Sequence, residues 1–355
     1  MKPKPVLGPD LDRLEQDLAR DVAALAALLG PRPSERDHAA VTEAVSAVVS
    51  SRRRLASALK AASARDGAET REARERRDTL RKARDRLRLW SRFEAVLEEQ
   101  HRAPRRGLME EPPRSDRPPE VMDHVVAMFV DMLHTLANPR AFTQTEAASK
   151  SGHWADIPYP MASFARVLGA AYRVCLAQRR PRPLRFLDVG SGGGVKLLAA
   201  TTCFHRCDGL EYDADAVRSG SRLLEVLAPE TCRLFHGDAL AFDRYGDYDV
   251  IYFFRPISET DRMAELEARI LAQVAPGTVL AVTGGLVGAE RHGDRVQRLA
   301  DQIHVAGLSA EEAARLRGFA EEMGTTVPGH GRRAAVDFGY WQPLREACAR
   351  NGYHV

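Results

Sequence analysis

The residues best placed to do chemistry lie near the middle of the 355-residue chain, in a glycine-rich stretch that reads FLDVGSGGGVKLLAA from Phe186 to Ala200. An apolar run that carries Asp188 comes first, then four glycines within five residues, then a helix-forming stretch from Lys196. This order predicts a strand, a tight turn and a helix, which is where open α/β sheets bind nucleotides. Glycine suits such a turn because the backbone adopts unusual dihedrals there and a ligand approaches it closely.

The spacing of the glycines indicates which nucleotide is bound. A dinucleotide fingerprint, GxGxxG, would place its third glycine where Val195 stands, and a Walker loop would need Gly-Lys-Ser or Gly-Lys-Thr after the turn. The residues from Asp188 to Gly194 instead read D-x-G-x-G-x-G. This pattern resembles motif I of the class I S-adenosylmethionine (SAM)-dependent methyltransferases.

Further strands follow in the order of that family. The segment CDGLEYD carries Glu211, 23 residues after Asp188, where a carboxylate can accept both ribose hydroxyls. The spacing alone would suit NAD as well. Residues 233–239 (RLFHGDA) predict a third strand, and residues 247–254 and 278–283 predict a fourth and a fifth. The resemblance covers residues 155–290 and implies SAM as the cofactor and S-adenosylhomocysteine (SAH) as the product.

The resemblance also implies a set of cofactor-binding residues. They are Asp188, Gly190, Ser191, Gly192, Gly194, Glu211, Tyr212, Asp238, Ala239 and Phe254. In this family the acid after the third strand, the position that Asp238 matches, usually holds the adenine amino group. Two alternatives stay open: Glu211 as a solvated acid at a strand end, and Gly237-Asp238 as an ordinary turn.

Residues that flank this core are candidates for the substrate pocket. In the family the segment before motif I commonly covers the cofactor, and here it carries Trp154 and Tyr159. Packing of these aromatics on the flank of the domain is the alternative. Arg255, after the fourth strand, would either bind an acidic or phosphate-bearing substrate or form a structural ion pair. Nucleobase amino methylation is disfavoured, because residues 254–257 (FRPI) lack the polar acceptor of the Asn/Asp-Pro-Pro-Tyr/Phe pattern.

The sequence assigns no catalytic residue and no metal site. No cysteine follows the fourth strand directly, which excludes a thiolate nucleophile for carbon-5 pyrimidine chemistry. No histidine or lysine is placed as a general base, and the acceptor atom is not identified. SAM is an activated donor, so positioning and desolvation of a nucleophile can suffice. Cys203, His205 and Cys207 have no second ligand pair at zinc spacing.

The remainder of the chain predicts a second, all-helical domain. Residues 1–102 show apolar residues at helical spacing, and residues 103–120 are rich in proline and charge, as in a linker. The methyltransferase domain takes 121–355, with its core over 155–290, a helical C-terminal extension over 291–355 and a candidate late strand at 334–338. The predicted fold class is therefore α/β, a Rossmann-like, doubly wound, mostly parallel sheet, with an N-terminal helical hairpin or bundle.

The helical region is also basic, with a net charge of about +9 over residues 52–106. One interpretation is a surface that meets RNA or a nucleoprotein. The favoured alternative is a solvated helix face, because acids are interleaved with the arginines at i,i+4 spacing. A stripe of Leu80, Leu87, Trp90 and Leu97 predicts packing against other helices, within the chain or in a homodimer.

Together these features predict a SAM-dependent methyltransferase. A macromolecular acceptor, protein or RNA, is favoured over a small molecule, and a non-catalytic scaffold that acts through its helical arm is the alternative. The helical arm and the GLEYD strand also resemble Dot1-like protein methyltransferases, although Phe254 replaces that family's asparagine. Five scattered cysteines favour a cytoplasmic protein with reduced thiols. No apolar run reaches membrane-spanning length, so no membrane contact is expected.

Overall fold

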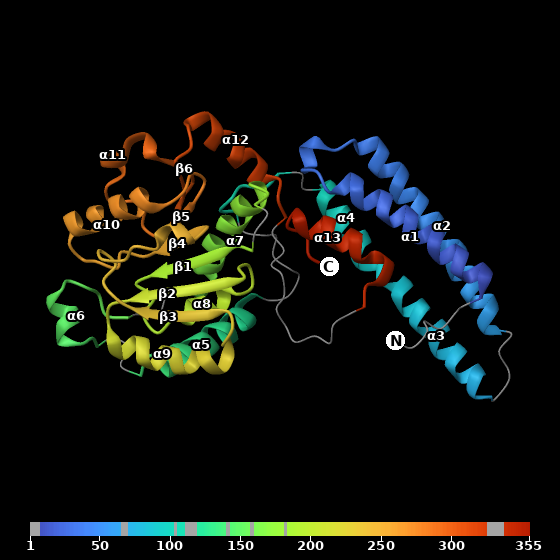
Figure 1. The fold of residues 1–355 in the computed structure, drawn as a ribbon, viewed down its shortest axis with the longest axis horizontal. Helices are drawn as coiled ribbons and strands as arrows, with labels where there is room; N and C mark the ends of the chain where they lie inside the picture. Colours follow the sequence, from blue (N-terminus) through green and yellow to red (C-terminus); the bar gives the residue numbers. More distant parts are fainter. Residues whose placement is uncertain are drawn as a thin grey trace. The chain divides into compact units, whose positions relative to one another are not determined.

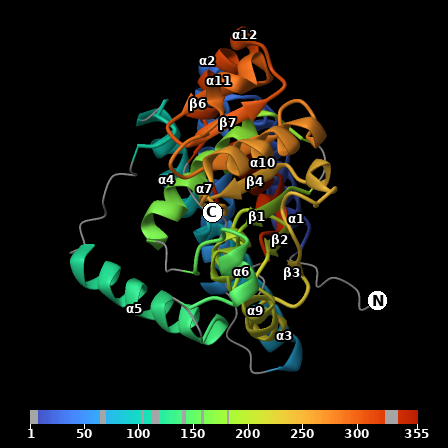
Figure 2. The ribbon, with the colours of Figure 1, turned by 90° about the vertical axis from the view of Figure 1, so that its left-hand side faces the viewer.

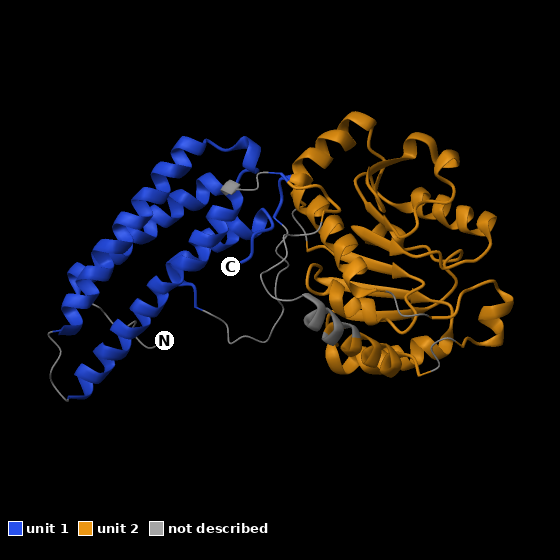
Figure 3. Ribbon diagram, turned by 180° about the vertical axis from the view of Figure 1, so that it is seen from behind, with its two compact units in different colours: residues 1–105, 322–326, 331–355 blue, residues 106–321, 327–330 orange. Residues whose placement is uncertain are grey.

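The computed structural model describes residues 8–64, 70–102, 105–110, 119–139, 143–156, 160–180, 183–324 and 337–355 (Figure 1). The chain divides into two compact units (Figure 3). Unit 1 comprises residues 1–105, 322–326 and 331–355, and unit 2 comprises residues 106–321 and 327–330. The C-terminal residues thus fold with the N-terminal helices, whereas the sequence predicts that they belong to the methyltransferase domain.

Unit 2 is built around a seven-stranded sheet in the order β3-β2-β1-β4-β5-β7-β6. Its first five strands pair in parallel, and they are β1 (Arg185–Val189), β2 (Arg206–Glu211), β3 (Cys232–His236), β4 (Val250–Phe253) and β5 (Val279–Val282). The α-helices of the unit are α5 (Pro119–Ala137), α6 (Glu146–Lys150), α7 (Met161–Ala177), α8 (Val195–Ala200), α9 (Ala214–Leu227), α10 (Thr260–Gln273), α11 (Ala289–His292) and α12 (Ala310–Glu321). The predicted fold class is confirmed.

Helices cover both faces of this sheet because successive side chains of a strand point to opposite sides. Leu187 of β1 and Ile251 of β4 pack in one cluster with Leu266 of α10. Their neighbours Phe186 and Tyr252 contact Phe164 of α7, with ring centroids 6.4 Å and 5.0 Å away. α5 lies beside α9, towards the β3 edge (Figure 2).

The structure corrects the prediction that residues 291–355 are a helical extension. β6 (Val296–Ala300) and β7 (Ile303–Ala306) form an antiparallel hairpin, and β7 pairs antiparallel with β5. Gln302, in the two-residue turn between them, adopts a φ of +63°. Glycine or asparagine usually takes this conformation in such a turn, so the sequence lacks a hairpin signal here. The candidate late strand at 334–338 lies mostly outside the described residues.

Unit 1 is a helical bundle. Its α-helices are α1 (Pro9–Leu29), α2 (His38–Ala64), α3 (Arg71–Arg88), α4 (Trp90–Arg102) and α13 (Gln342–Arg350). The predicted stripe packs inside this unit, where Leu80, Leu87 and Trp90 are buried. Trp341, just before α13, is also buried and its ring lies 5.6 Å from that of Trp90 and 5.5 Å from that of Phe93. The end of the chain joins this bundle because its aromatic side chain completes the core.

Part of the predicted linker is packed on unit 2. The backbone N–H of Arg106 donates to the carbonyl of Glu321 at 2.8 Å, and Leu108 is buried. The guanidinium of Arg173, in α7, donates to the carbonyl of Gly107 at 3.0 Å. Residues 103–104 and 111–118 of the predicted linker lie outside the described residues.

Candidate functional site

The site is organised around the turn that joins β1 to α8. Gly190, Gly192 and Gly194 adopt φ values of +76°, +55° and +75°, which residues with a side chain rarely take. A Cβ on Gly190 would lie 2.6 Å from Cβ of Pro256, and one on Gly192 would lie 2.2 Å from Cγ of Asp156. Glycine is required at these two positions because Pro256 and Asp156 lie so close to the backbone that they leave no space for a side chain.

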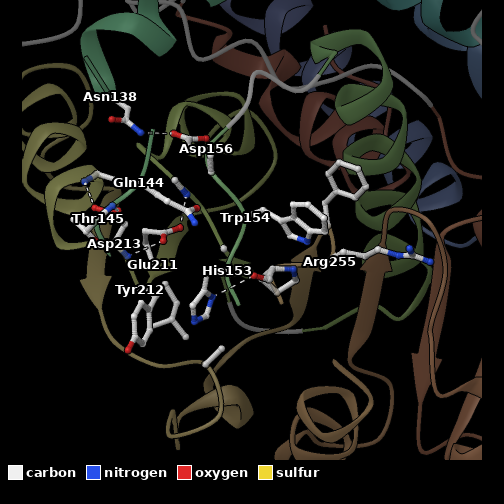
Figure 4. Close-up of a pocket in the computed structure, with 18 of the residues that line it drawn as sticks. Asn138, Gln144, Thr145, His153, Trp154, Asp156, Glu211, Tyr212, Asp213 and Arg255 are labelled. Atoms are coloured by element: carbon white, nitrogen blue, oxygen red, sulfur yellow. Dashed lines mark hydrogen bonds between the residues drawn. The ribbon is translucent and has the colours of Figure 1, made fainter. Parts of the chain in front are cut away.

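A cavity of about 550 Å³ opens beside this turn, within unit 2 (Figure 4). It lies at the carboxyl ends of β2 and β4, on either side of β1 in the sheet. The chain runs outward from β1 in both directions, to β2 and β3 on one side and to β4 and β5 on the other. Open α/β sheets bind ligands at such a reversal of strand order, because the connections diverge there and leave a crevice.

The structure brings most of the predicted site residues to this cavity. Those that line it are Gly190, Gly192, Glu211, Tyr212, Ala239, Phe254, Trp154 and Arg255. Asp188 and Ser191 are buried, and Asp238 accepts a hydrogen bond of 2.8 Å from the backbone N–H of Leu240, as in an ordinary turn. Gly194 caps α8 in a left-handed conformation. Tyr159 lies outside the described residues.

Glu211, at the end of β2, holds the glycine turn. One carboxylate oxygen, Oε2, accepts from the backbone N–H of Gly192 at 2.8 Å, and the other, Oε1, accepts from that of Asp213 at 2.8 Å. Burial raises the pKa of Glu211, and these two hydrogen bonds oppose the rise. Its carboxylate is therefore fixed by the backbone rather than freely solvated, and each oxygen keeps a lone pair for a ligand.

A buried ion pair lies next to the turn. Asp188 is fully buried, with its Oδ2 3.4 Å from Nζ of Lys196, a lysine that the sequence analysis did not select. Neither oxygen of Asp188 has a hydrogen-bond partner within the described residues. Burial raises the pKa of Asp188 to about 6, although the charge of Lys196 opposes the rise. Burial would lower the pKa of Lys196, but nearby groups, Asp188 foremost, raise it.

Two further residues that the sequence analysis missed complete the turn. Oδ2 of Asp156 accepts from the backbone N–H of Gly193 at 2.9 Å and from Nδ2 of Asn138 at 3.1 Å. Asn138 follows α5 directly and is buried. Neither residue stands in a recognisable motif, because both reach the turn from loops tens of residues away in the chain.

His153 is held in one tautomer by the loop after β4. Its Nδ1 lies 3.2 Å from the carbonyl oxygen of Pro256, which can only accept, so Nδ1 carries the proton. The ring stacks on Tyr212, with centroids 4.2 Å apart. Burial lowers the pKa of His153, which keeps the imidazole neutral near pH 7. Nε2 is then an acceptor, and no described residue hydrogen-bonds to it.

The segment that carries His153 spans the cavity from the β2 side to the β4 side. The backbone N–H of Thr145 donates to Oδ2 of Asp213 at 2.8 Å, and the hydroxyls of Ser151 and Tyr212 are 3.1 Å apart. On the other side, the backbone N–H of Ser258 donates to the carbonyl of Gly152 at 2.8 Å. Residues 143–156 therefore bridge the β2 side and the β4 side of the cavity.

Trp154, from the segment 143–156, and the side chains that follow β4 give the cavity an aromatic and basic side. Trp154 is 64% exposed and Phe254 is 42% exposed, so packing on the flank of the domain does not describe Trp154. Arg255 is exposed and has a φ of +40°. Its guanidinium makes no ion pair with any described residue. The described part of the chain therefore does not support the alternative that Arg255 forms a structural ion pair.

Three other features bear on the sequence-based predictions. Within the described ranges, no cluster of three or more histidine, cysteine, aspartate or glutamate side chains is arranged to hold a metal ion. None of the described helices combines the length and the apolar character needed to cross a bilayer. All five cysteines are buried as free thiols.

Known proteins resemble this chain only in part. No protein-family model matches it, and no curated protein sequence does. A sugar N-methyltransferase from Streptoalloteichus is 21% identical and the match covers 34% of this chain and 47% of that one, with a TM-score of 0.28. An amino pentose methyltransferase from Micromonospora echinaspora is 24% identical over 37% of this chain and 58% of that one, with a TM-score of 0.27. An RNA methyltransferase from Salinibacter ruber in complex with SAH is 20% identical over 42% of this chain and 91% of that one, with a TM-score of 0.30. The chain thus matches about half the length of the two sugar methyltransferases, and the likeness to all three is one of fold.

Proposed function

We propose that this protein is a SAM-dependent methyltransferase that binds SAM in the cavity of unit 2. The observation that carries the proposal is the contact between Glu211 and the glycine turn. The carboxylate of Glu211, at the end of β2, accepts from the backbone N–H of Gly192 at 2.8 Å, and it lines the cavity with lone pairs that can accept further hydrogen bonds. A nucleoside placed here would direct its ribose hydroxyls to Glu211.

The charges around the turn favour SAM over a dinucleotide. In a dinucleotide site the N–H groups of such a turn receive an anionic pyrophosphate. Here the N–H groups of Gly192 and Gly193 are taken by the carboxylates of Glu211 and Asp156. These carboxylates would repel a pyrophosphate, whereas the amino-acid end of SAM carries an ammonium group that they attract. The alternative of NAD, which spacing alone left open, is therefore disfavoured.

The residues present fit the parts of SAM. Glu211 would hold the ribose, and Tyr212 and Ala239 line the part of the cavity where the resemblance puts the adenine. Gly190 and Gly192 bring bare backbone to the cavity, since a side chain on either would collide with its neighbours. The carboxylates of Glu211 and Asp156, which accept from the N–H groups of the turn, place negative charge there, whereas the charge of Asp188 is offset by Lys196. A cationic ligand would therefore be stabilised here.

The chain itself has little covalent chemistry to perform. Bound SAM would supply an activated methyl group on its sulfonium sulfur and would leave as SAH. The segment 143–156 would exclude water and position the acceptor. His153 lines the cavity, but its Nε2 is buried, so no described residue is assigned as a general base.

Calorimetric titration with SAH tests the cofactor site. Gly192→Arg should abolish the binding heat, because even a Cβ at this position would overlap the Asp156 carboxylate. Gly318→Arg, in α12, is the matched control, since a Cβ there meets no atom within 4 Å, and it should bind SAH like the parent chain. Absence of heat with the folded parent chain would end the proposal.

A non-catalytic scaffold remains the second candidate, because the sequence carries no assigned catalytic residue. Such a protein would keep the fold and act through its helical unit. Incubation of the chain with methyl-labelled SAM and cell extract separates the two functions. Label that enters protein, RNA or small molecules supports the enzyme, and binding of SAH without any transfer of label supports the scaffold.

For the methyl acceptor we propose a macromolecule, protein or RNA, rather than a small molecule. The excess of basic residues in unit 1 motivates this choice, since a separate charged unit is of little use to an enzyme that methylates a small molecule. A homodimer stays a prediction, and the apolar stripe on which it depended is buried within unit 1.

A further inference from the structure

The cavity of unit 2 has two chemically different sides. Asp156, Glu211 and Asp213 lie on one side, and Trp154 and Arg255 lie on the other (Figure 4). The first side suits a cationic ligand, and the second offers aromatic rings and a positive charge. A cavity with this division can hold two ligands of opposite charge at once, each placed by the side that attracts it.

Arg255 is placed on its side by the backbone around it. Its φ of +40° is unusual for a residue with a side chain, and such conformations persist only where the surroundings impose them. The next residue, Pro256, contacts Gly190 so closely that a Cβ on Gly190 would lie 2.6 Å from Cβ of the proline. The carbonyl of Pro256 also accepts from Nδ1 of His153. These contacts fix the chain directly after the strained residue.

The guanidinium of Arg255 has no carboxylate among the described residues to neutralise it. Its Nε lies 3.8 Å from where a Cβ of Gly284 would be, so it extends over the loop after β5. The acids of the cavity lie on the other side (Figure 4). An exposed arginine held in a strained conformation without a protein partner is well suited to bind an anion from solution.

Aromatic side chains accompany this cation. Trp154 is 64% exposed and Phe254 is 42% exposed, and both line the cavity. The other two tryptophans, Trp90 and Trp341, are 2% and 0% exposed. Exposed aromatics beside a basic side chain are the elements with which proteins hold single-stranded nucleic acids, since every base presents a π face.

We infer that the methyl acceptor is a nucleotide, whose base stacks on Trp154 and whose phosphate pairs with Arg255. This inference rests on the proposed function, because it assigns the acceptor side of the same cavity. A lysine side chain of a protein substrate would bring a second cation next to Arg255, which is unfavourable. In keeping with a macromolecular acceptor, the nucleotide would belong to an RNA strand. A free nucleotide presents the same planar ring and anionic phosphate, and the test below separates the two sources.

Fluorescence of Trp154 provides the test, because it is the exposed one of the three tryptophans. The full chain, saturated with SAH, is titrated with uridine, uridine monophosphate, a single-stranded oligouridylate and an acidic peptide. Stacking should quench the emission of Trp154 with the nucleotides, and more weakly with the neutral nucleoside. Quenching by uridine monophosphate identifies a free nucleotide as sufficient, and quenching by the oligonucleotide alone identifies a strand.

Two variants separate this site from general charge effects. Arg255→Gln should weaken nucleotide binding about tenfold, as expected for loss of a charge-assisted hydrogen bond, while SAH still binds in calorimetry. Arg298→Gln removes an exposed arginine of β6 that pairs with Asp301 and should bind like the parent. Trp154→Phe should lose the fluorescence change but keep most of the affinity in a filter-binding assay.

The inference is overturned if SAH binds and no nucleotide quenches Trp154. It is also overturned if uridine and uridine monophosphate bind equally and Arg255→Gln changes neither, or if the acidic peptide binds best. Failure of SAH to bind the folded chain would instead overturn the proposed function, and this inference with it.

Discussion

Replacement of Trp341 by alanine tests whether the end of the chain belongs to the core of unit 1. This side chain is fully buried, its ring stacks on Phe93 with centroids 5.5 Å apart, and it lies 5.6 Å from the ring of Trp90. Its Nε1–H donates to the carbonyl of Arg86 at 2.9 Å. The side chain thus joins the C-terminal segment to α3 and α4.

The expected cost follows from the buried area. A buried tryptophan removes about 150–250 Å² from water, which corresponds to about 4–6 kcal/mol at roughly 25 cal/mol per Å². Measured replacements of large aromatics by alanine cost about 3–5 kcal/mol, because the cavity partly collapses. The carbonyl of Arg86 also loses its donor. Since a whole domain is stable by only about 5–15 kcal/mol, Trp341→Ala should remove much of the stability of unit 1.

Urea denaturation of the full chain measures this effect. In a Trp154→Phe background, Trp90 reports on unit 1, and the urea midpoint of Trp341→Ala should fall by about 2 M for a slope of about 2 kcal/mol per M. Trp341→Phe keeps an aromatic ring and should lose less. Binding of SAH, measured by calorimetry without urea, should be unchanged, because the cavity residues all belong to unit 2. An unchanged urea midpoint for Trp341→Ala would refute the placement of the C-terminal segment in this core.

Two further predictions concern charge. Burial raises the pKa of Asp188 from 3.8 to about 6, so the folded chain holds this proton more tightly than the unfolded chain does. The resulting stability, about 3 kcal/mol at most, is present below pH 4 and is lost as the pH rises through 6. Urea denaturation from pH 4.5 to 7.5 should therefore show that Asp188→Asn gains stability relative to the parent as the pH rises. A difference in stability that stays constant over this range would contradict the burial argument. In unit 1, four exposed arginines of α3, Arg74, Arg76, Arg77 and Arg84, make no ion pair with any described residue. Arg84 donates to the carbonyl of Leu59 at 3.3 Å, so the interpretation of unit 1 as an RNA-binding surface predicts phosphate contacts by Arg74, Arg76 and Arg77. Replacement of these three arginines by glutamate should weaken binding to oligouridylate and reduce the slope of log K against log salt concentration by about 2. The same replacement of Arg298, in unit 2, should change neither quantity. An unchanged slope for the α3 variant would favour a purely structural role for the helix.

Local sequence pattern was sufficient for the parallel half of the sheet. An apolar run, a glycine turn and a helix follow one another within fifteen residues from Phe186 to Ala200, so the pattern can be recognised from neighbouring residues alone. The same holds for Glu211, because a residue at the end of a strand neighbouring β1 must lie beside the turn that follows β1. The helices of unit 1 were also recognisable, since their apolar residues recur at the helical period.

Contacts between distant segments decided the rest. Asp156 and His153 gained their positions only through Gly193 and Pro256, and no spacing in the chain announces those contacts. The β6–β7 hairpin was missed because Gln302 occupies the left-handed turn position where a glycine would have signalled it. The sequence alone did not determine which unit receives the end of the chain. A tryptophan such as Trp341 is expected to pack in a core, but the choice of core depends on contacts with segments more than two hundred residues away, such as that of Trp90.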